Sequence, residues 1–418
     1  MSEKVDVIVI GAGAGGMMAA GRAAERGAKV ILIEKNSILG KKLLITGKGR
    51  CNVTNDTDIE DIISNFPGNG RFLYSPLYTF TNLDVMNFFT NLGVKLKTER
   101  GGRVFPVSDK AKDIVKALEK YLQLGKVKVI KNSKVEEIIS ENGGAKIVHL
   151  EGGEKIKAPQ VIIATGGLSY PGTGSTGDGY LWSEKLGHKI VTPKPSLIPL
   201  ITKESWIEDL QGLSLKNITI SLNDRNGKKI AQDFGEMIFT HYGVSGPVVL
   251  SISRKAVLYW EKNSKPLNMS IDLKPALSIE KLDLRLQRDF EKYCNKDFRN
   301  GLNDLLPQRL IPIVIMLAKI DPYKKINLIT KEERQNLNYV IKNLKLTATG
   351  TRPISEAIVT KGGVNVKEIN PHTMESKKIN GLFFCGEIID IDGYTGGYNL
   401  QAAFSTGYLA GENISIYE

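Results

Sequence analysis

Cysteine is scarce in this 418-residue sequence, which contains three: Cys51, Cys294 and Cys385. They form neither a C-x-x-C pair nor a zinc-ligand pattern, so the sequence predicts no disulfide framework and no structural metal site. This usage is typical of proteins in a reducing compartment. We therefore expect a cytoplasmic protein.

Long apolar runs are also missing. The longest, residues 310–318, is interrupted by Pro312 and is far shorter than a membrane span, and residues 5–10 are too few for the core of a signal peptide. The hydrophobic content of 41% and the charged content of 24% are ordinary for globular proteins. The sequence therefore predicts no membrane contact, and its 418 residues are enough for two or three domains.

The net charge is +12, which raises the question of a nucleic-acid partner. The lysines are spread along the chain, no block of like charge reaches five residues, and a positive field would also serve an anionic cofactor. We therefore expect a small-molecule substrate and regard nucleic acid as an unlikely partner. None of these patterns predicts the oligomeric state.

The first 34 residues carry the strongest local pattern. Residues 5–34 read as an apolar strand, a glycine turn, a helix of small residues, a second strand and an acid. The turn contains Gly11, Gly13 and Gly16 as G-x-G-x-x-G, and Glu34 follows the second strand, where a ribose would offer its hydroxyls. Because the helix N-terminus can face a pyrophosphate, this unit predicts a Rossmann-like dinucleotide site.

The residue pattern of the chain changes twice after this unit. From about residue 192, three prolines introduce residues that read as short strands, and residues 278–344 have apolar side chains at helix spacing. Past residue 347 the glycine-rich strand pattern returns. We therefore predict a discontinuous first domain, with segments at residues 1–192 and 347–418, interrupted by a β-rich substrate domain at 193–276 and a helical part at 277–346.

Two further glycine-rich segments follow strands. The strand at residues 161–165 ends in A-T-G-G, and the T-G-D-G at residues 176–179 is consistent either with a helix cap or with a cofactor contact. Near the end of the chain, the strand at residues 382–385 runs into a glycine turn that opens a helix at Tyr398. A helix N-terminus there would stabilise the negative charge of a reduced flavin.

These motifs carry a family resemblance. The glycine turn with Glu34, the A-T-G-G exit and the C-terminal G-E resemble the FAD-binding fold of the glutathione reductase class. GKKLLITGKGRCNVTN at residues 40–55, THYGVSGP at 240–247 and CGEIIDIDGYTGGYNLQAA at 385–403 resemble the HI0933/YhiN-like FAD-dependent oxidoreductases, a family with aminoacetone oxidase and BaiN-type members. The resemblance implies an α/β fold, in which an insert with a β-barrel part and a helical part interrupts the FAD-binding domain.

The resemblance also implies which residues contact FAD. The pyrophosphate and adenosine end would be held by Gly11, Gly13, Ala14, Gly16, Glu34, Lys35, Thr165 and Gly166. The flavin and ribitol would be lined by Lys42, Thr46, Gly47, Arg50, Cys51, Asn52, Gly386, Glu387, Gly397, Asn399 and Leu400. The disulfide reductases of the wider class use two close cysteines and a second nucleotide unit, and neither is present here. A dithiol relay is therefore not expected, and NAD(P)H would bind transiently at the flavin.

The pairing of A-T-G-G with T-G-D-G is also similar to the fumarate reductase and aspartate oxidase flavoproteins, which suggests chemistry at a carbon–carbon double bond. The sequence predicts reduction of an activated C=C bond with NAD(P)H as donor. The candidates for the proton donor or substrate clamp are Arg103, His241, Tyr242 and Tyr398. Two alternatives stay open: an oxygen-dependent oxidase of a primary amine, and a flavin-binding protein that modifies RNA or is regulatory.

Overall fold

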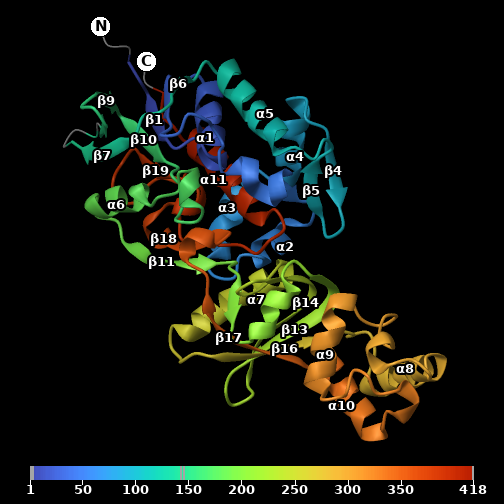
Figure 1. Ribbon diagram of the computed structural model, residues 1–418. Coiled ribbons are helices and arrows are strands. Elements are labelled where there is room, and N and C mark those ends of the chain that lie inside the picture. The colour runs from blue at the N-terminus through green and yellow to red at the C-terminus, as the bar shows by residue number, and fades with distance from the viewer. Residues whose placement is uncertain (1–3, 142–143, 145, 417–418) are drawn as a thin grey trace. The chain divides into compact units, whose positions relative to one another are not determined.

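The computed structural model describes residues 4–141, 144 and 146–416. The chain divides into two compact units (Figure 1). Unit 1 contains Met1–Pro195 and Ile354–Glu418, and unit 2 contains Ser196–Pro353. Unit 1 is thus built from two segments that are distant in the sequence.

A five-stranded parallel sheet forms the centre of unit 1. Its order is β19 (Leu382–Phe384), β10 (Gln160–Ile163), β1 (Val7–Ile10), β2 (Val30–Ile33) and β6 (Lys128–Ile130). The side chains of β1, β2 and β10 are buried throughout, as expected for parallel strands covered on both faces. The C-terminal segment therefore supplies a strand beside those of the N-terminal segment.

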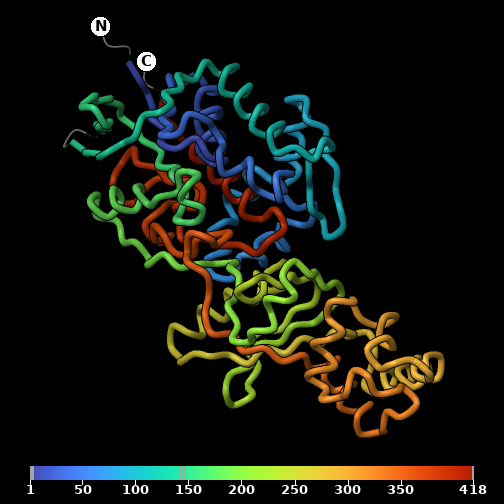
Figure 2. Tube along the Cα trace, in the orientation of Figure 1, coloured from blue at the N-terminus to red at the C-terminus, as the bar shows by residue number. Residues whose placement is uncertain are grey.

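Small residues let the helices of unit 1 approach closely. A Cβ at Gly407 of α11 (Tyr398–Glu412) would lie 2.3 Å from the carbonyl oxygen of Gly15 in α1 (Ala14–Glu25). On another face of α1, a Cβ at Gly21 would lie 2.2 Å from the ring of Tyr121 in α5 (Ala111–Leu124). The first and last segments of the chain thus lie side by side (Figure 2).

Smaller elements complete unit 1. The remaining helices are α2 (Ile59–Ser64), α3 (Tyr74–Thr79), α4 (Asn82–Asn91) and α6 (Asp178–Lys185). One small sheet contains β3 (Thr54–Asn55), β5 (Arg103–Pro106) and β4 (Leu96–Glu99), and another contains β7 (Val135–Ser140), β8 (Lys146–Leu150) and β9 (Lys155–Ala158). A strand pair is formed by β11 (Ile190–Ser196) and β18 (Val359–Val364).

A closed six-stranded barrel forms the first part of unit 2. Its order is β12 (Leu200–Thr202), β15 (Gly243–Ser245), β14 (Lys229–Thr240), β13 (Ser214–Asn223), β16 (Leu267–Asp272) and β17 (Leu344–Thr351). Alternate residues of β17, beginning with Leu344 and Leu346, are buried, which is the pattern of strands with one face in a core. The barrel therefore encloses its own apolar core.

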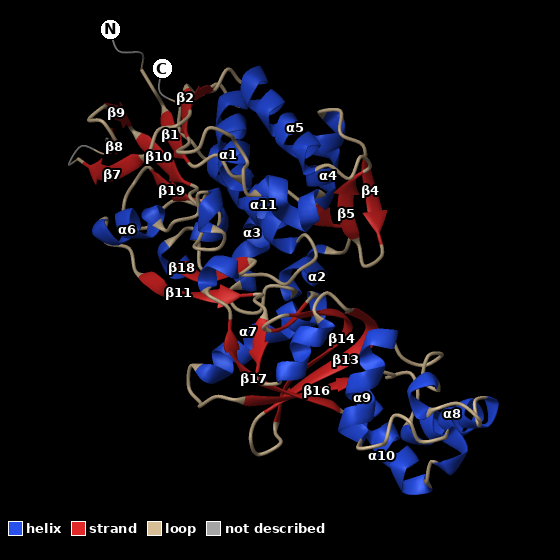
Figure 3. Cartoon of the chain, in the orientation of Figure 1, coloured by secondary structure: helices blue, strands red, loops and turns tan. Residues whose placement is uncertain are grey.

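The second part of unit 2 is helical, with α8 (Ile279–Lys292), α9 (Ile311–Ala318) and α10 (Lys331–Lys342). Ser278 caps α8 through a bond from the backbone N–H of Lys281, and Thr330 caps α10 through a capping box with Glu333. Figure 3 shows these helices in blue beside the red strands of the barrel. No helix among the described residues is long and apolar enough to cross a membrane.

One expectation for the β-rich stretch is wrong. Residues 247–260 form a 14-residue helix, α7 (Pro247–Trp260), where short strands were predicted. The β-branched residues suggested strand, but Val248, Ile252 and Ala256 recur at four-residue spacing and are buried together. Pro247 opens the helix because the first turn does not need its missing N–H.

Candidate functional site

Three glycines shape the turn between β1 and α1. At Gly11, whose φ is +101°, a Cβ would lie 2.6 Å from the carbonyl oxygen of Ala164, and at Gly16 it would lie 1.9 Å from that of Gly11. The packing of the protein itself therefore requires glycine at both positions. Gly13 is different: it is the N-cap of α1, and no described atom lies within 4 Å of a Cβ built there. Since a helix N-terminus attracts anions, the open space beside Gly13 fits a pyrophosphate.

Glu34 is held at the end of β2, beside the glycine turn. Its Oε2 accepts a hydrogen bond of 2.8 Å from the backbone N–H of Ala12. Its Oε1 accepts bonds from the backbone N–H and the Nδ2 of Asn36, at 2.8 and 2.7 Å. The carboxylate is thus fixed where the ribose of a dinucleotide would lie.

The T-G-D-G segment is bonded to the residues after Glu34. The Nζ of Lys35 lies 2.8 Å from the Oδ2 of Asp178 and also bonds the hydroxyl of Thr176. Burial opposes ionisation of Asp178, but the hydrogen bonds from Lys35 and Thr176 hold its pKa below the usual value. Gly177 is the N-cap of α6, and no side chain caps that helix. Asp178 therefore ties this segment to the predicted adenosine end and does not cap α6.

The loop predicted to line the flavin is tightly turned. Gly47, Lys48 and Cys51 have φ of +56°, +60° and +60°, in the left-handed region. The backbone N–H of Cys51 donates to the carbonyl oxygen of Thr46 at 3.0 Å. This turn places Asn52 at the start of a buried segment.

Two buried polar atoms at the predicted cofactor site lack partners. The Oδ1 of Asn52 and the Oγ1 of Thr165 have no hydrogen-bond partner among the described residues. Buried polar groups nearly always have one, and FAD is rich in polar atoms that could supply it. Together with the space beside Gly13, these atoms show that the residues present fit FAD.

Glu387 joins segments from three parts of the chain. Its Oε2 lies 2.6 Å from the Nζ of Lys42. Its Oε1 accepts from the hydroxyl of Ser169 at 2.8 Å and from the backbone N–H of Thr360 at 2.7 Å. Lys42 also donates to Ser169 at 2.5 Å. The cluster connects the predicted flavin loop, the segment after the A-T-G-G exit, β18 and the C-terminal motif.

The C-terminal turn leads into α11. Gly397 has φ of +100°, and a Cβ there would lie 2.3 Å from the carbonyl oxygen of Thr54. The Oδ1 of Asn399 accepts from the backbone N–H of Gly393, and its Nδ2 donates to the carbonyl oxygen of Gly393, both at 2.8 Å. Leu400 follows in the first turn of the helix. The structure thus fixes this turn against β3.

Arg50 is held by other side chains. Its guanidinium pairs with Glu99, bonds the Oδ1 of Asp109 at 2.7 Å and lies 4.0 Å from the ring centre of Phe105. Contact of this side chain with a flavin would therefore require it to leave one of these partners.

Unit 1 contains two of the four candidate catalytic residues. Arg103 is exposed on β5, and its Nε donates to the carbonyl oxygen of Arg100 at 3.1 Å. Tyr398 opens α11, and partial burial raises its pKa. Asn55 connects β5 with the turn before α11. It pairs with Arg103 in the small sheet, and its Nδ2 donates to the carbonyl oxygen of Gly396 at 2.9 Å.

Unit 2 contains the other two. His241 and Tyr242 lie in the turn between β14 and β15, with their rings edge to face and 4.8 Å apart. The guanidinium of Arg352 lies 4.7 Å from the ring centre of Tyr242. The backbone N–H of Arg352 donates to Pro199 at 3.3 Å, so this cluster lies at the barrel end where the chain enters and leaves unit 2.

The sequence patterns did not predict several residues of these clusters. Ser169, Thr360 and Arg352 are distant in the chain from the residues they contact, and no local pattern marks them. Asp390 could have been found, because it stands in the apolar I-I-D-I-D after Glu387. Burial raises its pKa, and its carboxylate accepts from Asn69 and from the backbone N–H of a residue in β18, both at 3.0 Å.

The three thiols should differ sharply in reactivity. Burial raises the pKa of Cys51 and of Cys385 to about 12, whereas Cys294 is half-buried. Since the thiolate is the nucleophile, we expect iodoacetamide to label Cys294 in the folded protein, and all three cysteines in urea. Peptide mass spectrometry measures this. Labelling of folded Cys51 as fast as that of Cys294 would contradict it.

A family model described as the HI0933-like protein Rossmann domain matches residues 5–413. The chain belongs to this family. It is 33% identical over 408 residues to a 3-dehydro-bile acid delta(4,6)-reductase of Clostridium scindens, covering 96% of this chain and 97% of the relative. It is 31% identical over 420 residues to a ribosomal RNA dihydrouridine synthase of Haemophilus influenzae, covering 99% and 100%.

Solved structures with low sequence identity share the fold. A 3-ketosteroid-delta4-(5alpha)-dehydrogenase from Rhodococcus jostii RHA1 superposes with a TM-score of 0.54 at 15% identity, over 99% of this chain and 97% of that one. A flavocytochrome c3 fumarate reductase gives 0.51 at 17% identity, over 99% and 78%. The predicted fold class is confirmed: a Rossmann-like FAD-binding domain interrupted by an insert with a barrel and a helical part.

The HI0933/YhiN-like resemblance is likewise confirmed, and the chain is an FAD-dependent oxidoreductase. FAD as cofactor is also confirmed. NAD(P)H as donor, the cytoplasmic location and the absence of a nucleic-acid partner stay predictions.

Proposed function

We propose that this enzyme reduces a C=C bond conjugated to a carbonyl group in a small organic substrate, with NAD(P)H as donor. The observation that carries the proposal is the near full-length similarity to two relatives whose names share this chemistry. A delta(4,6)-reductase of a 3-dehydro bile acid acts on double bonds that are conjugated with a ketone. Dihydrouridine is uridine in which the ring C=C bond next to a carbonyl group has gained two hydrogens.

The proposal assigns FAD to the residues described above. The pyrophosphate would be held by Gly11, Gly13, Ala14 and Gly16. The adenosine end would be held by Glu34, Lys35, Thr165 and Gly166. The ribitol and ring would be lined by Lys42, Thr46, Gly47, Arg50, Cys51, Asn52, Gly386, Glu387, Gly397, Asn399 and Leu400. When bound there, FAD would supply the hydride-transfer chemistry between the nicotinamide and the substrate. The helix N-terminus at Gly397 would stabilise negative charge on the reduced ring.

The protein must also orient the substrate and supply a proton. We assign substrate binding to the insert at residues 193–276, through His241 and Tyr242, together with Arg352 at the end of unit 2. The guanidinium of Arg352 over the Tyr242 ring gives a fixed positive charge that could polarise a carbonyl oxygen. Tyr398 and Arg103 of unit 1 remain candidates for the proton donor or the substrate clamp.

Anaerobic assays of the FAD-loaded protein test the reaction. We expect NADH or NADPH to bleach the flavin absorbance, and a steroid with a 4-en-3-one group or 2-cyclohexenone to restore it. In a separate assay in air, peroxide formed from aminoacetone without nicotinamide would instead support the amine oxidase alternative and contradict the proposal.

A variant separates the two halves of this reaction. With His241→Phe, we expect reoxidation by the enone to slow by about 10²- to 10⁴-fold, the usual share of one general acid or base, while bleaching by NAD(P)H is unchanged. Stopped-flow absorbance measures both steps. Equal loss in both steps would argue for a general structural effect, and an unchanged reoxidation rate would remove His241 from the site.

Uridine in RNA is a second candidate substrate. Unit 2 carries 25 Lys and Arg against 17 Asp and Glu, so its net charge is +8 of the total +12. This excess favours binding of a polyanion, and a second ribosomal RNA dihydrouridine synthase, of Escherichia coli, is 31% identical over 417 residues. Mass spectrometry of an rRNA transcript incubated with enzyme and NADPH would reveal dihydrouridine. Its formation, with no turnover of free enones, would favour this candidate.

A further inference from the structure

A pocket in unit 2 lies between the barrel and the helical part. Its volume is about 240 Å³, below the about 300–1,000 Å³ typical of sites for drug-sized ligands. The walls are mostly buried apolar side chains: Leu215, Ile218, Leu273, Leu306 and Leu310, with the exposed Pro307 at the rim. A small ligand with an apolar body would match these walls.

The pocket exists because the barrel opens locally. Strand β13 pairs with β16 from Thr219 onward, where Thr219 faces Asp272, so residues 214–218 have no partner on that side. The ladder of β13 with β14 is also irregular between Leu215 and Ile218, where Asn217 has φ of +54°. The chain leaves β16 at Leu273, and the helical part closes the opening.

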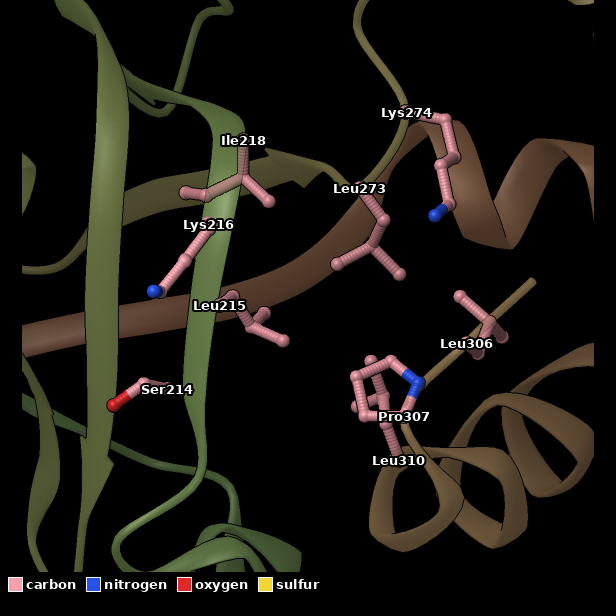
Figure 4. A pocket seen from close by; sticks show the side chains of 9 residues that line it. All are labelled: Ser214, Leu215, Lys216, Ile218, Leu273, Lys274, Leu306, Pro307 and Leu310. Atoms are coloured by element: carbon pink, nitrogen blue, oxygen red, sulfur yellow. The ribbon is translucent and has the colours of Figure 1, made fainter. Parts of the chain in front are cut away.

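One amino group faces this apolar space. The backbone of Lys274 is fixed, because its N–H donates to the Oδ1 of Asp272 at 2.9 Å and its carbonyl oxygen accepts from Lys342 at 3.1 Å. Its Nζ has no hydrogen bond or ion pair within the part of the chain that the structure describes. In Figure 4 that amino group points toward the gap between Leu273 and Leu306, whereas the amino group of Lys216 points the other way.

The charges around the pocket favour an anion. The residues that line it include no acid, and the carboxylate of Asp272 pairs with Lys342 at 2.6 Å. Burial and the nearby Arg285 lower the pKa of Lys274, which is the effect of a cation without a counterion. A carboxylate would supply that counterion.

We propose that this pocket binds a small amphipathic monocarboxylate of the medium-chain fatty acid type, with its alkyl chain against the leucines and its carboxylate on Lys274. The pocket is within unit 2, so the proposal does not depend on the reaction proposed above. It assigns unit 2 a second ligand, separate from the substrate.

Calorimetric titration of the FAD-loaded full chain with octanoate tests the proposal. We expect saturable binding that weakens by about tenfold for hexanoate, because each buried methylene contributes to affinity. Lys274→Met should weaken octanoate binding by about 10- to 100-fold and leave the weaker binding of octanol unchanged. Lys274→Arg, which keeps the charge, should retain most of the affinity.

Lys262→Met is the matched control, since it removes one exposed lysine from the same unit. It should leave octanoate binding unchanged, and far-UV circular dichroism, which reports on both units, should show that every variant is folded. Four outcomes would overturn the proposal: no saturable octanoate binding, equal weakening by both methionine variants, equal binding of octyltrimethylammonium, or a site at Lys274 that takes an RNA oligonucleotide and no octanoate.

Discussion

Gly13→Ala is expected to yield a folded protein that no longer retains FAD. A Cβ at this position meets no described atom within 4 Å, and its φ of −82° suits alanine, so the fold itself should tolerate the methyl group. The same methyl group would occupy the space at the N-terminus of α1 that we assign to the pyrophosphate. We expect FAD affinity to fall by about 100-fold or more, which is about 3 kcal/mol.

Gly16→Ala is the matched comparison, because a methyl group at that position should disturb the fold as well as FAD binding. There the Cβ would lie 1.9 Å from the carbonyl oxygen of Gly11, so the strand–turn–helix unit itself must shift. We expect this variant to lose both FAD and stability of the apoprotein. Fluorescence titration with FAD and urea unfolding of the apoproteins measure the two effects. Tight FAD binding by Gly13→Ala would show that the pyrophosphate lies elsewhere.

The part of the site that could be predicted from sequence is the part encoded locally. Gly11, Gly13, Gly16 and Glu34 fall within one strand–turn–helix–strand unit, so their spacing alone indicates their arrangement. The return of the C-terminal segment to the same sheet was also predictable, because its strand and glycine texture matches the first segment.

Contacts between distant segments could not be predicted in this way. Glu387 and Lys42 were both expected at the cofactor, but nothing in the sequence indicates that they bond each other or that Ser169 joins them. The pairing of Tyr242 with Arg352 likewise depends on closure of the barrel, which brings strand ends together regardless of sequence distance.

Helix α7 shows a second limit. Its β-branched residues favour strand by intrinsic preference, whereas the burial of Val248, Ile252 and Ala256 on one face selects helix. Propensities span about 1 kcal/mol or less per residue, and burying an apolar side chain contributes more, so tertiary packing decides the outcome.

Glu387→Ala is expected to destabilise the protein by about 2–4 kcal/mol. The substitution leaves the Lys42 ammonium, the Ser169 hydroxyl and the Thr360 N–H without their shared acceptor, and both charged side chains of the pair are only about one quarter exposed or less. The matched control is Glu137→Ala, which removes an ion pair with Lys185 whose side chains are 40% and 65% exposed. We expect a change within about 0.5 kcal/mol there.

Urea unfolding of the apoproteins measures these changes, and a double-mutant cycle with Lys42→Met isolates the pair. We expect the double variant to lose less stability than the sum of the single variants. Once Glu387 is removed, replacing Lys42 no longer breaks an ion pair. Strict additivity would mean that the 2.6 Å contact contributes nothing to stability. Since Lys42 belongs to the predicted flavin loop and Glu387 to the C-terminal motif, a coupled pair would show that these two segments of the predicted cofactor site are already joined in the apoprotein. FAD binding would then carry no free-energy cost for bringing these two segments together.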